Sequence, residues 1–259
     1  MSENPNYLPL SYKSEISYIR NKVIEEYDMR RGGYSITLSE GLIEDEGVLN
    51  DLAMANKHDK QIILGLYAKN DKEYVKALNN GFRKYVTAFA KYNSLSQDNI
   101  LSIKKDSLTF FNGKITRTKF KQVLFTKRGE YTSMLRIGNL EFYINSKTKE
   151  RLLKGITIDD YKETLIEEIF KVLELAELPD PKKLHFRLSE IRDAYIHKRL
   201  TDSYYRELSV HNAYLLRNSI SGFTMYSKTP LQEGDAFFDE TDITYNYRRV
   251  LMPLFEALL

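Results

Sequence analysis

The 259-residue sequence has no cysteine and no tryptophan. Without cysteine, the chain can form no disulfide bond, no zinc–thiolate site and no thiol nucleophile, which fits a reducing compartment. No apolar run approaches the roughly 20 residues that a membrane-spanning helix needs. The N-terminus has no basic segment followed by an apolar one, so we expect no signal peptide. These absences predict a cytoplasmic protein, of a bacterium or of a virus-infected cell, without a membrane partner.

Several enzyme signatures are also missing. No glycine-rich phosphate loop or dinucleotide-binding fingerprint occurs, and Gly32-Gly33 and Gly41 fit neither pattern. His58, His185 and His211 show no ligand spacing such as a helical pair four residues apart, which argues against a histidine-based metal site. Carboxylates and basic side chains are therefore the main candidates for chemistry.

The composition is that of a globular protein, with 42% hydrophobic and 29% charged residues. The length suits one large domain or two small ones. The net charge of +3 hides a basic middle, because residues 103–136 hold nine Lys or Arg against two acids. This asymmetry indicates a local surface for a polyanion such as nucleic acid. The alternative is a solvated face of a sheet, on which basic and apolar residues also alternate.

Apolar residues at steps of three and four predict helices in the first third of the chain. One of these segments could also end in a strand that runs through Tyr27. The predicted helices are 15–25, 51–66 and 69–92.

The middle of the chain changes to short apolar runs typical of an antiparallel sheet. Turn signals separate them at Asn112-Gly113, Arg128-Gly129 and Gly138-Asn139. The predicted strands are 100–103, 108–111, 122–125, 131–137 and 140–144.

Beyond Gly155 the helical spacing returns. The predicted helices there are 161–178, 184–208 and 245–258, with an acidic loop at 229–242. The sequence thus predicts an α+β fold in which N-terminal helices accompany an antiparallel, palm-like sheet, and a helical part follows. We place one domain at residues 1–155 and a helical domain at 156–259.

An abrupt polar interruption, Lys104-Lys105-Asp106-Ser107, separates two of the predicted strands. A carboxylate at a tight bend is costly unless it holds a positive group, usually a metal ion, although aspartate is also a routine turn residue. Asp28 offers a second carboxylate at the end of another short apolar run. Two acids on neighbouring strand ends are how two-metal phosphoryl-transfer sites are built, so Asp28 and Asp106 are the candidate metal ligands and catalytic residues.

Three segments around these acids follow a familiar order. Glu26–Ser35 reads as a strand ending in Asp28, then a turn and an aromatic residue. A helical segment next carries Lys76, Asn79, Gly81 and Phe82. Ile103–Leu108 reads as a hairpin with Asp106 at its turn. This order resembles the palm of template-directed nucleic-acid polymerases, including the family A and family B DNA polymerases and their single-subunit RNA polymerase relatives.

The resemblance, which extends over residues 14–144, implies a nucleotidyltransferase that binds nucleic acid. It implies that Asp28 and Asp106 share Mg²⁺ or Mn²⁺ ions. We expect phosphate binding by the cations near these motifs, namely Lys69, Lys76, Arg83 and Lys105. We expect nucleic-acid binding by the basic strands, through Lys119, Lys121, Lys127 and Arg128.

The sequence also departs from the palm pattern. Lys104-Lys105 replaces the acid or histidine that precedes the aspartate of the third motif, and these lysines could form ion pairs with Asp106. The second and third motifs are too close in sequence for a full fingers domain. An inactivated or repurposed palm is therefore the alternative to a working one.

Two other classes of function stay open. Arg192 and His197, five residues apart on a predicted helix, resemble the active motif of HEPN ribonucleases, which cleave RNA without a metal ion. A non-catalytic inhibitor or adaptor of viral or bacterial origin would instead bind a protein partner, through the helices of the C-terminal third.

Overall fold

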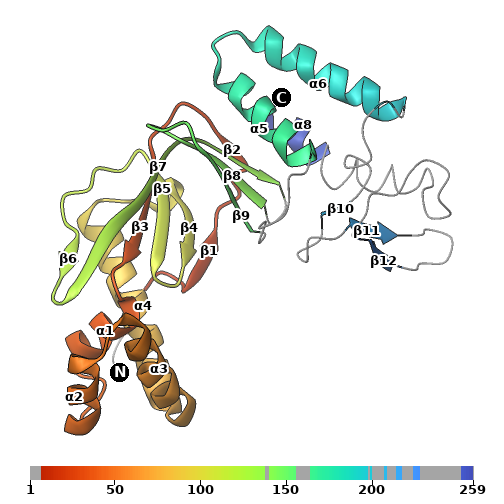
Figure 1. Ribbon diagram of the computed structural model, residues 1–259. Helices are drawn as coiled ribbons and strands as arrows, with labels where there is room; N and C mark the ends of the chain where they lie inside the picture. Colours follow the sequence, from red (N-terminus) through yellow and green to blue (C-terminus); the bar gives the residue numbers. More distant parts are fainter. Residues whose placement is uncertain are drawn as a thin grey trace. The chain divides into compact units, whose positions relative to one another are not determined.

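The computed structural model describes residues 7–137, 140–155, 164–197, 199, 207–208, 214–217, 224–227 and 252–258. The chain forms two compact units (Figure 1). The first consists of Met1–Glu15 and Val23–Glu130, and the second of Ile16–Lys22 and Tyr131–Leu259. Helices accompany antiparallel sheets, which confirms the predicted α+β class. The domain boundary predicted between residues 155 and 156 stays a prediction.

The first unit is built on a sheet in which β4 and β5 form a central hairpin. Its strand order is β1 (Ser11–Lys13), β4 (Ile100–Lys104), β5 (Ser107–Phe111), β3 (Ile24–Met29) and the first part of β7 (Val123–Ile137). The short β6 (Lys119–Phe120) pairs with β7. The strand that was predicted as one alternative through Tyr27 is therefore present. The helix predicted at 15–25 is wrong, because Ile19 pairs in β2 and Ile24 in β3.

The predicted bend at Asp106 is confirmed. Lys105 adopts a left-handed φ of 53°, which closes the turn between β4 and β5. The antiparallel register of β3 on β5 places Asp28 opposite Ser107. The backbone N–H of Met29 donates to the carbonyl of Asp106 at 3.0 Å. The end of β3 is thus fixed beside the bend.

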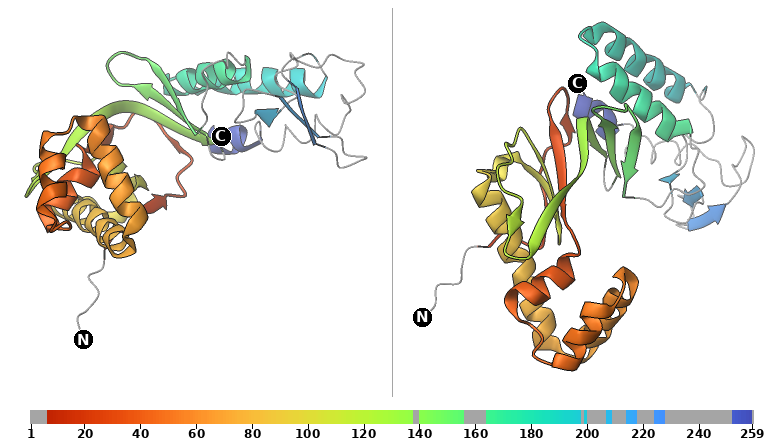
Figure 2. Two further views of the ribbon diagram at one scale, coloured as in Figure 1. Left: turned by 60° about the horizontal axis from the view of Figure 1, so that its bottom comes forward. Right: turned by 60° about the vertical axis from the view of Figure 1, so that its left-hand side comes forward.

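Helix α4 (Lys72–Tyr92) lies along one face of this sheet (Figures 1 and 2). Phe89 is fully buried, and its ring stacks on that of Phe125 with centroids 4.4 Å apart. The predicted spacing of three and four residues therefore does mark the buried face. The helix begins later than predicted because Asp71 caps it, accepting a hydrogen bond from the backbone N–H of Tyr74.

Three shorter helices complete the first unit: α1 (Gly32–Glu40), α2 (Glu46–Met54) and α3 (Lys57–Asn70). The single helix predicted at 51–66 is wrong. Asn56 interrupts it, because its side-chain oxygen accepts from the N–H groups of His58 and Asp59 and starts a new helix. Gly81 lets α1 approach α4 closely, since a Cβ atom there would meet the side chain of Ile36 at 2.3 Å.

Two predicted turns are absent from the first unit. Arg128-Gly129 lies within the continuous strand β7, so the two strands predicted there are one. Asn112-Gly113 makes no hairpin, and residues 112–118 form a loop between β5 and β6. Gly138-Asn139 lies outside the described residues.

In the second unit, β2 (Tyr18–Ile19) and β8 (Leu140–Asn145) pair with the rest of β7, and β9 (Arg151–Lys154) pairs with β8. The helices are α5 (Thr164–Glu177), α6 (Pro181–Ile196) and α8 (Met252–Leu258). Phe142 packs against Phe170 with ring centroids 5.1 Å apart in a core that also includes Leu254. None of the helices in the described part of the chain has the length and apolarity to cross a bilayer.

A further small sheet has the order β10 (Glu207–Leu208), β11 (Tyr214–Arg217) and β12 (Thr224–Ser227). Helix α6 therefore ends at Ile196, and residues 207–208 of the helix predicted at 184–208 form a strand instead. Residues 198 and 200–206 lie outside the described residues. The acidic loop predicted at 229–242, and residues 245–251 of the predicted last helix, lie outside the described residues.

A buried ion pair contributes to the stability of the second unit. The side chains of Arg136 and Glu141, 6% and 4% exposed, meet at 3.1 Å across the β7–β8 pair. We expect Glu141→Leu to lower the free energy of unfolding by about 3–5 kcal/mol, because the buried guanidinium loses its counter-ion. We expect the double variant Arg136→Met/Glu141→Leu to lose much less. Urea denaturation measures both.

The matched control is Glu73→Ala, which removes the partner of Lys76 in a pair whose side chains are 86% and 72% exposed. This change should cost less than about 1 kcal/mol. Equal losses for Glu73→Ala and Glu141→Leu would contradict the argument from burial.

Candidate active site

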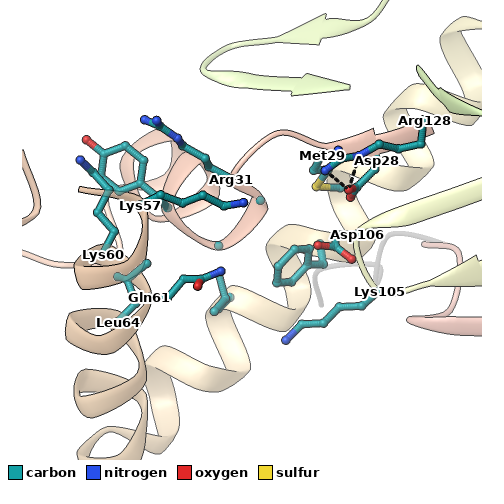
Figure 3. A pocket seen from close by; sticks show the side chains of 15 residues that line it. Asp28, Met29, Arg31, Lys57, Lys60, Gln61, Leu64, Lys105, Asp106 and Arg128 are labelled. Carbon is teal, nitrogen blue, oxygen red and sulfur yellow. Dashed lines mark hydrogen bonds and ion pairs between the residues drawn. The ribbon is translucent and has the colours of Figure 1, made fainter. Parts of the chain in front are cut away.

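A pocket of about 390 Å³ lies where the end of β3 and the β4–β5 bend meet α1, α3 and α4 (Figure 3). All of its walls belong to the first unit. Both predicted acids, Asp28 and Asp106, line it. The basic residues that line it are Arg31, Lys57, Lys60, Lys105 and Arg128.

The two carboxylates lie near one another on the same side of the pocket (Figure 3). Burial raises the pKa of Asp106, and the negative charge of Asp28 raises it further. Among the described residues Asp106 forms no ion pair. Asp28 accepts from Arg128, whose Nε and a terminal nitrogen both reach Oδ2, at 3.0 and 2.9 Å. The other oxygen of Asp28 takes no part in that pair.

The donor set fits a hard divalent cation. Two nearby acids, one of them half-buried and without a counter-ion among the described residues, supply the oxygen ligands that Mg²⁺ prefers. The described part of the chain gathers no group of three or more acidic or histidine side chains. A Mg²⁺ ion accepts this limited set because it usually keeps several of its waters and binds through one or two carboxylates.

The opposite side of the pocket carries cations that the sequence did not single out. Lys57 and Lys60 come from the first turn of α3, and Arg31 from the residue before α1 (Figure 3). The amine of Lys60, a residue only 8% exposed, donates to the carbonyl of Ala55 at 2.5 Å and lies 5.0 Å from the centre of the Tyr34 ring. These cations make the pocket suited to a phosphorylated ligand.

The start of α1 depends on a close backbone approach. A Cβ atom on Gly32 would meet the Phe82 ring at 3.0 Å and the Cβ of Asp106 at 3.4 Å. Arg31, before it, adopts a left-handed φ of 54°. Gly32 therefore brings α1 against the bend, and its lack of a side chain is what allows Arg31 to line the same pocket as Asp106.

The predicted phosphate-binding residues divide into two groups. Lys105 lines the pocket, with its amine 4.9 Å from the centre of the Phe82 ring. The others do not line it: Lys69 lies in the last turn of α3, Lys76 is paired with Glu73 at 3.8 Å, and Arg83 is exposed on α4. The sequence contained one signal for the cations that do line the pocket. Lys57 and Lys60 are three residues apart on a predicted helix, a spacing that places both on the same face.

The predicted nucleic-acid-binding residues are mostly engaged within the protein. Lys121 pairs with Glu40 at 3.2 Å, and Lys127 pairs with Glu25 at 2.5 Å and also with Glu130. Arg128 holds Asp28. Lys119 is exposed and has no ion pair among the described residues.

The side chains of Arg192 and His197 each contact a different group of Asp193. The guanidinium of Arg192 pairs with the carboxylate of Asp193 at 2.9 Å. The His197 ring bonds through Nδ1 to the backbone oxygen of Asp193 at 2.7 Å. Both side chains are exposed at the end of α6. The ribonuclease reading stays a prediction.

Comparison with known proteins identifies a phage family. No curated protein sequence matches the chain. Among solved structures, the family B DNA polymerase of the hyperthermophilic archaeon Pyrobaculum calidifontis is similar over 100% of this chain, at 10% identity and a TM-score of 0.47. This chain spans 47% of that polymerase. The family described as Bacteriophage PBS1 gene 130 protein matches residues 3–230. The chain belongs to the family of the bacteriophage PBS1 gene 130 protein.

Proposed function

We propose that this protein is a divalent-metal-dependent nucleotidyltransferase of the polymerase type, which acts on nucleic acid at the pocket of Asp28 and Asp106. One observation carries the proposal. Two acids on adjacent strand ends share a pocket with five basic side chains. Lys105 comes from the same bend as Asp106, and the other four come from three further parts of the fold. Such a pocket can hold both a divalent cation and the phosphates of a nucleotide.

Asp28 and Asp106 would hold the ion. When bound, Mg²⁺ or Mn²⁺ would activate the attacking hydroxyl and neutralise charge on the transferred phosphoryl group. A bound ion would favour the ionised form of Asp106 and so oppose the burial that raises the pKa of this carboxyl group. Arg128 fixes the orientation of the Asp28 carboxylate.

Lys57, Lys60 and Arg31 would bind the phosphate chain of the incoming nucleotide. Lys60 is held in place by its bond to Ala55, so it offers a fixed positive charge. Leu64, Leu78 and Phe82 supply the apolar part of the lining. A pocket with charged groups on two sides and apolar groups between them suits a nucleotide, which has a charged chain and a flat base.

Lys104 and Lys105 stand where the palm pattern has an acid or a histidine before Asp106. Asp106 nevertheless lines the pocket. The amine of Lys105 lies over the Phe82 ring. Among the described residues no ion pair joins Lys105 to Asp106. This arrangement favours a working site over an inactivated one.

The catalytic role is tested by primer extension. An end-labelled primer–template, with DNA and RNA tested separately, is incubated with all nucleotides and Mg²⁺ or Mn²⁺. We expect elongation by the wild type and a loss of at least about 100-fold for Asp106→Asn and for Asp28→Asn, because each removes an ion ligand worth several kcal/mol in the transition state. Asp98→Asn, an exposed acid outside the pocket, is the control. Undiminished elongation by Asp106→Asn would refute the assignment.

The raised pKa of Asp106 predicts a pH-dependent effect on stability. The Asp106 carboxyl group keeps its proton to higher pH in the folded protein than in the unfolded chain, where the pKa of aspartate is about 3.9. Stability therefore falls as the pH rises through the window above that value. Without divalent ions, we expect Asp106→Asn to raise the melting temperature at pH 7 and to lose this advantage as the pH falls toward about 4. Scanning fluorimetry measures it.

Added Mg²⁺ should give the wild type a higher melting temperature than Asp106→Asn. The ion binds the folded wild type and raises its melting temperature, whereas Asp106→Asn should respond little. Asp98→Asn again serves as the control and should behave like the wild type in both series. A wild type that is as stable as Asp106→Asn at pH 7 without Mg²⁺ would contradict the raised pKa of Asp106.

The phosphate-binding role of Lys57 is tested by measuring the reaction rate as a function of nucleotide concentration. We expect Lys57→Gln to raise the KM for the nucleotide about tenfold, with a smaller effect on kcat, because a charge-assisted bond to phosphate contributes about 1.5–3 kcal/mol. Lys69→Gln is the matched control, since Lys69 lies on the same helix outside the pocket. Equal KM values for Lys57→Gln and Lys69→Gln would exclude this side of the pocket from nucleotide binding.

A further inference from the structure

The loop between β5 and β6 is fixed by one buried side chain. Asn93, 4% exposed at the C-terminal end of α4, accepts at its Oδ1 from the backbone N–H groups of Thr116 and Arg117, at 2.7 and 2.9 Å. Its Nδ2 donates to the carbonyls of Phe89 and Arg117, at 2.8 Å each. The amide is thus engaged at both of its polar atoms, and it holds the loop at a defined position against the helix.

The loop presents an arginine between two aromatic rings. The guanidinium carbon of Arg117 lies 4.6 Å from the centre of the Tyr92 ring and 4.9 Å from that of Phe120. Its Nε donates to the carbonyl of Lys119 at 3.1 Å, which further restricts the side chain. Tyr92 is 59% exposed although it is a large aromatic residue. An ordered guanidinium and an exposed ring are therefore held side by side on the surface.

The charge of this surface is not neutralised within the described part of the chain. Three exposed lysines are close in sequence to this contact: Lys114 and Lys119 lie on either side of Arg117, and Lys91 precedes Tyr92. None of these four cations forms an ion pair with a described residue. Lys84, Lys121 and Lys127 are different, because each is paired with a glutamate. The basic character predicted for residues 103–136 is thus concentrated here.

We propose that Tyr92, Arg117 and these three lysines, the Arg117 platform, bind single-stranded nucleic acid. Exposed bases can stack on Tyr92 and on the guanidinium plane, while the lysines contact phosphates. An acidic polypeptide would use the lysines but would gain little from an exposed aromatic ring held beside an arginine. The combination therefore favours a strand with unpaired bases.

The Arg117 platform is separate from the pocket. Both adjoin α4, with Phe82 at the pocket and Tyr92 ten residues later, a distance of roughly 15 Å along the helix axis. The proposal does not rest on catalysis at Asp28 and Asp106. A protein with no transferase activity could still hold a strand in this way.

The experiment is fluorescence anisotropy with labelled oligo(dT) and oligo(U) of 20 nucleotides, and with polyglutamate as the acidic polypeptide. We expect binding of an oligonucleotide and a loss of about five- to a hundredfold in affinity for Tyr92→Ala, the range for one stacked base. Tyr92→Phe should retain the affinity. Lys119→Gln should reduce the slope of log affinity against log salt by about 0.7 for a lost phosphate contact on a single strand.

Matched controls separate this surface from general effects. Phe186→Ala removes an exposed aromatic ring on α6, and Lys147→Gln removes an exposed cation that has no ion pair among the described residues. Both should bind like the wild type. Melting curves verify folding of each variant. Wild-type affinity in both Tyr92→Ala and Lys119→Gln, binding of polyglutamate alone, or no binding of any probe would overturn the proposal.

Discussion

The register of β3 against β5 is the constraint on which the rest of the candidate site depends. It sets Asp28 opposite Ser107 and joins the backbone of Met29 to Asp106. A slip of one residue would turn every side chain of β3 to the other face of the sheet. The two acids would then no longer share a pocket. Buried Tyr27 and Met29 oppose such a slip, because their side chains share the face that packs with α4 and would be removed from that core.

Helix α4 supports both surfaces that we assign to nucleic acid. Its buried side carries Phe82, Tyr85 and Phe89 against the sheet, and the Phe89 ring contacts several other aromatic rings of this core. Aromatic contacts of this kind hold the helix at a defined position because they resist both sliding and rotation. The pocket at one part of the helix and the Arg117 platform at its end therefore share one rigid support.

The sequence was sufficient for elements whose signal is local. The periodicity of α4, the strands β4, β5 and β8, and the polar bend at Asp106 follow from side-chain spacing alone. The errors at 15–25 and 51–66 arose because strand pairing and the cap at Asn56 overrode the helical pattern. Lys57 and Lys60 were missed because no local rule says where a helix will dock. Charge counts likewise could not show that Lys121 and Lys127 are paired with glutamates.

The close contact at Gly32 limits how this pocket can diversify. A Cβ atom at that position would press on the Phe82 ring at 3.0 Å and on the Cβ of Met29 at 3.2 Å, and one at Gly81 would meet Ile36 at 2.3 Å. Sequence drift on these sides would distort the backbone that carries the acids. Variation without that penalty has room at the exposed lining residues, which are Arg31, Lys57, Gln61, Lys105 and Arg128. Members of this family should accordingly keep both glycines and differ at these exposed positions, so that most of the evolvability of the pocket lies in side chains that reach it from the surface.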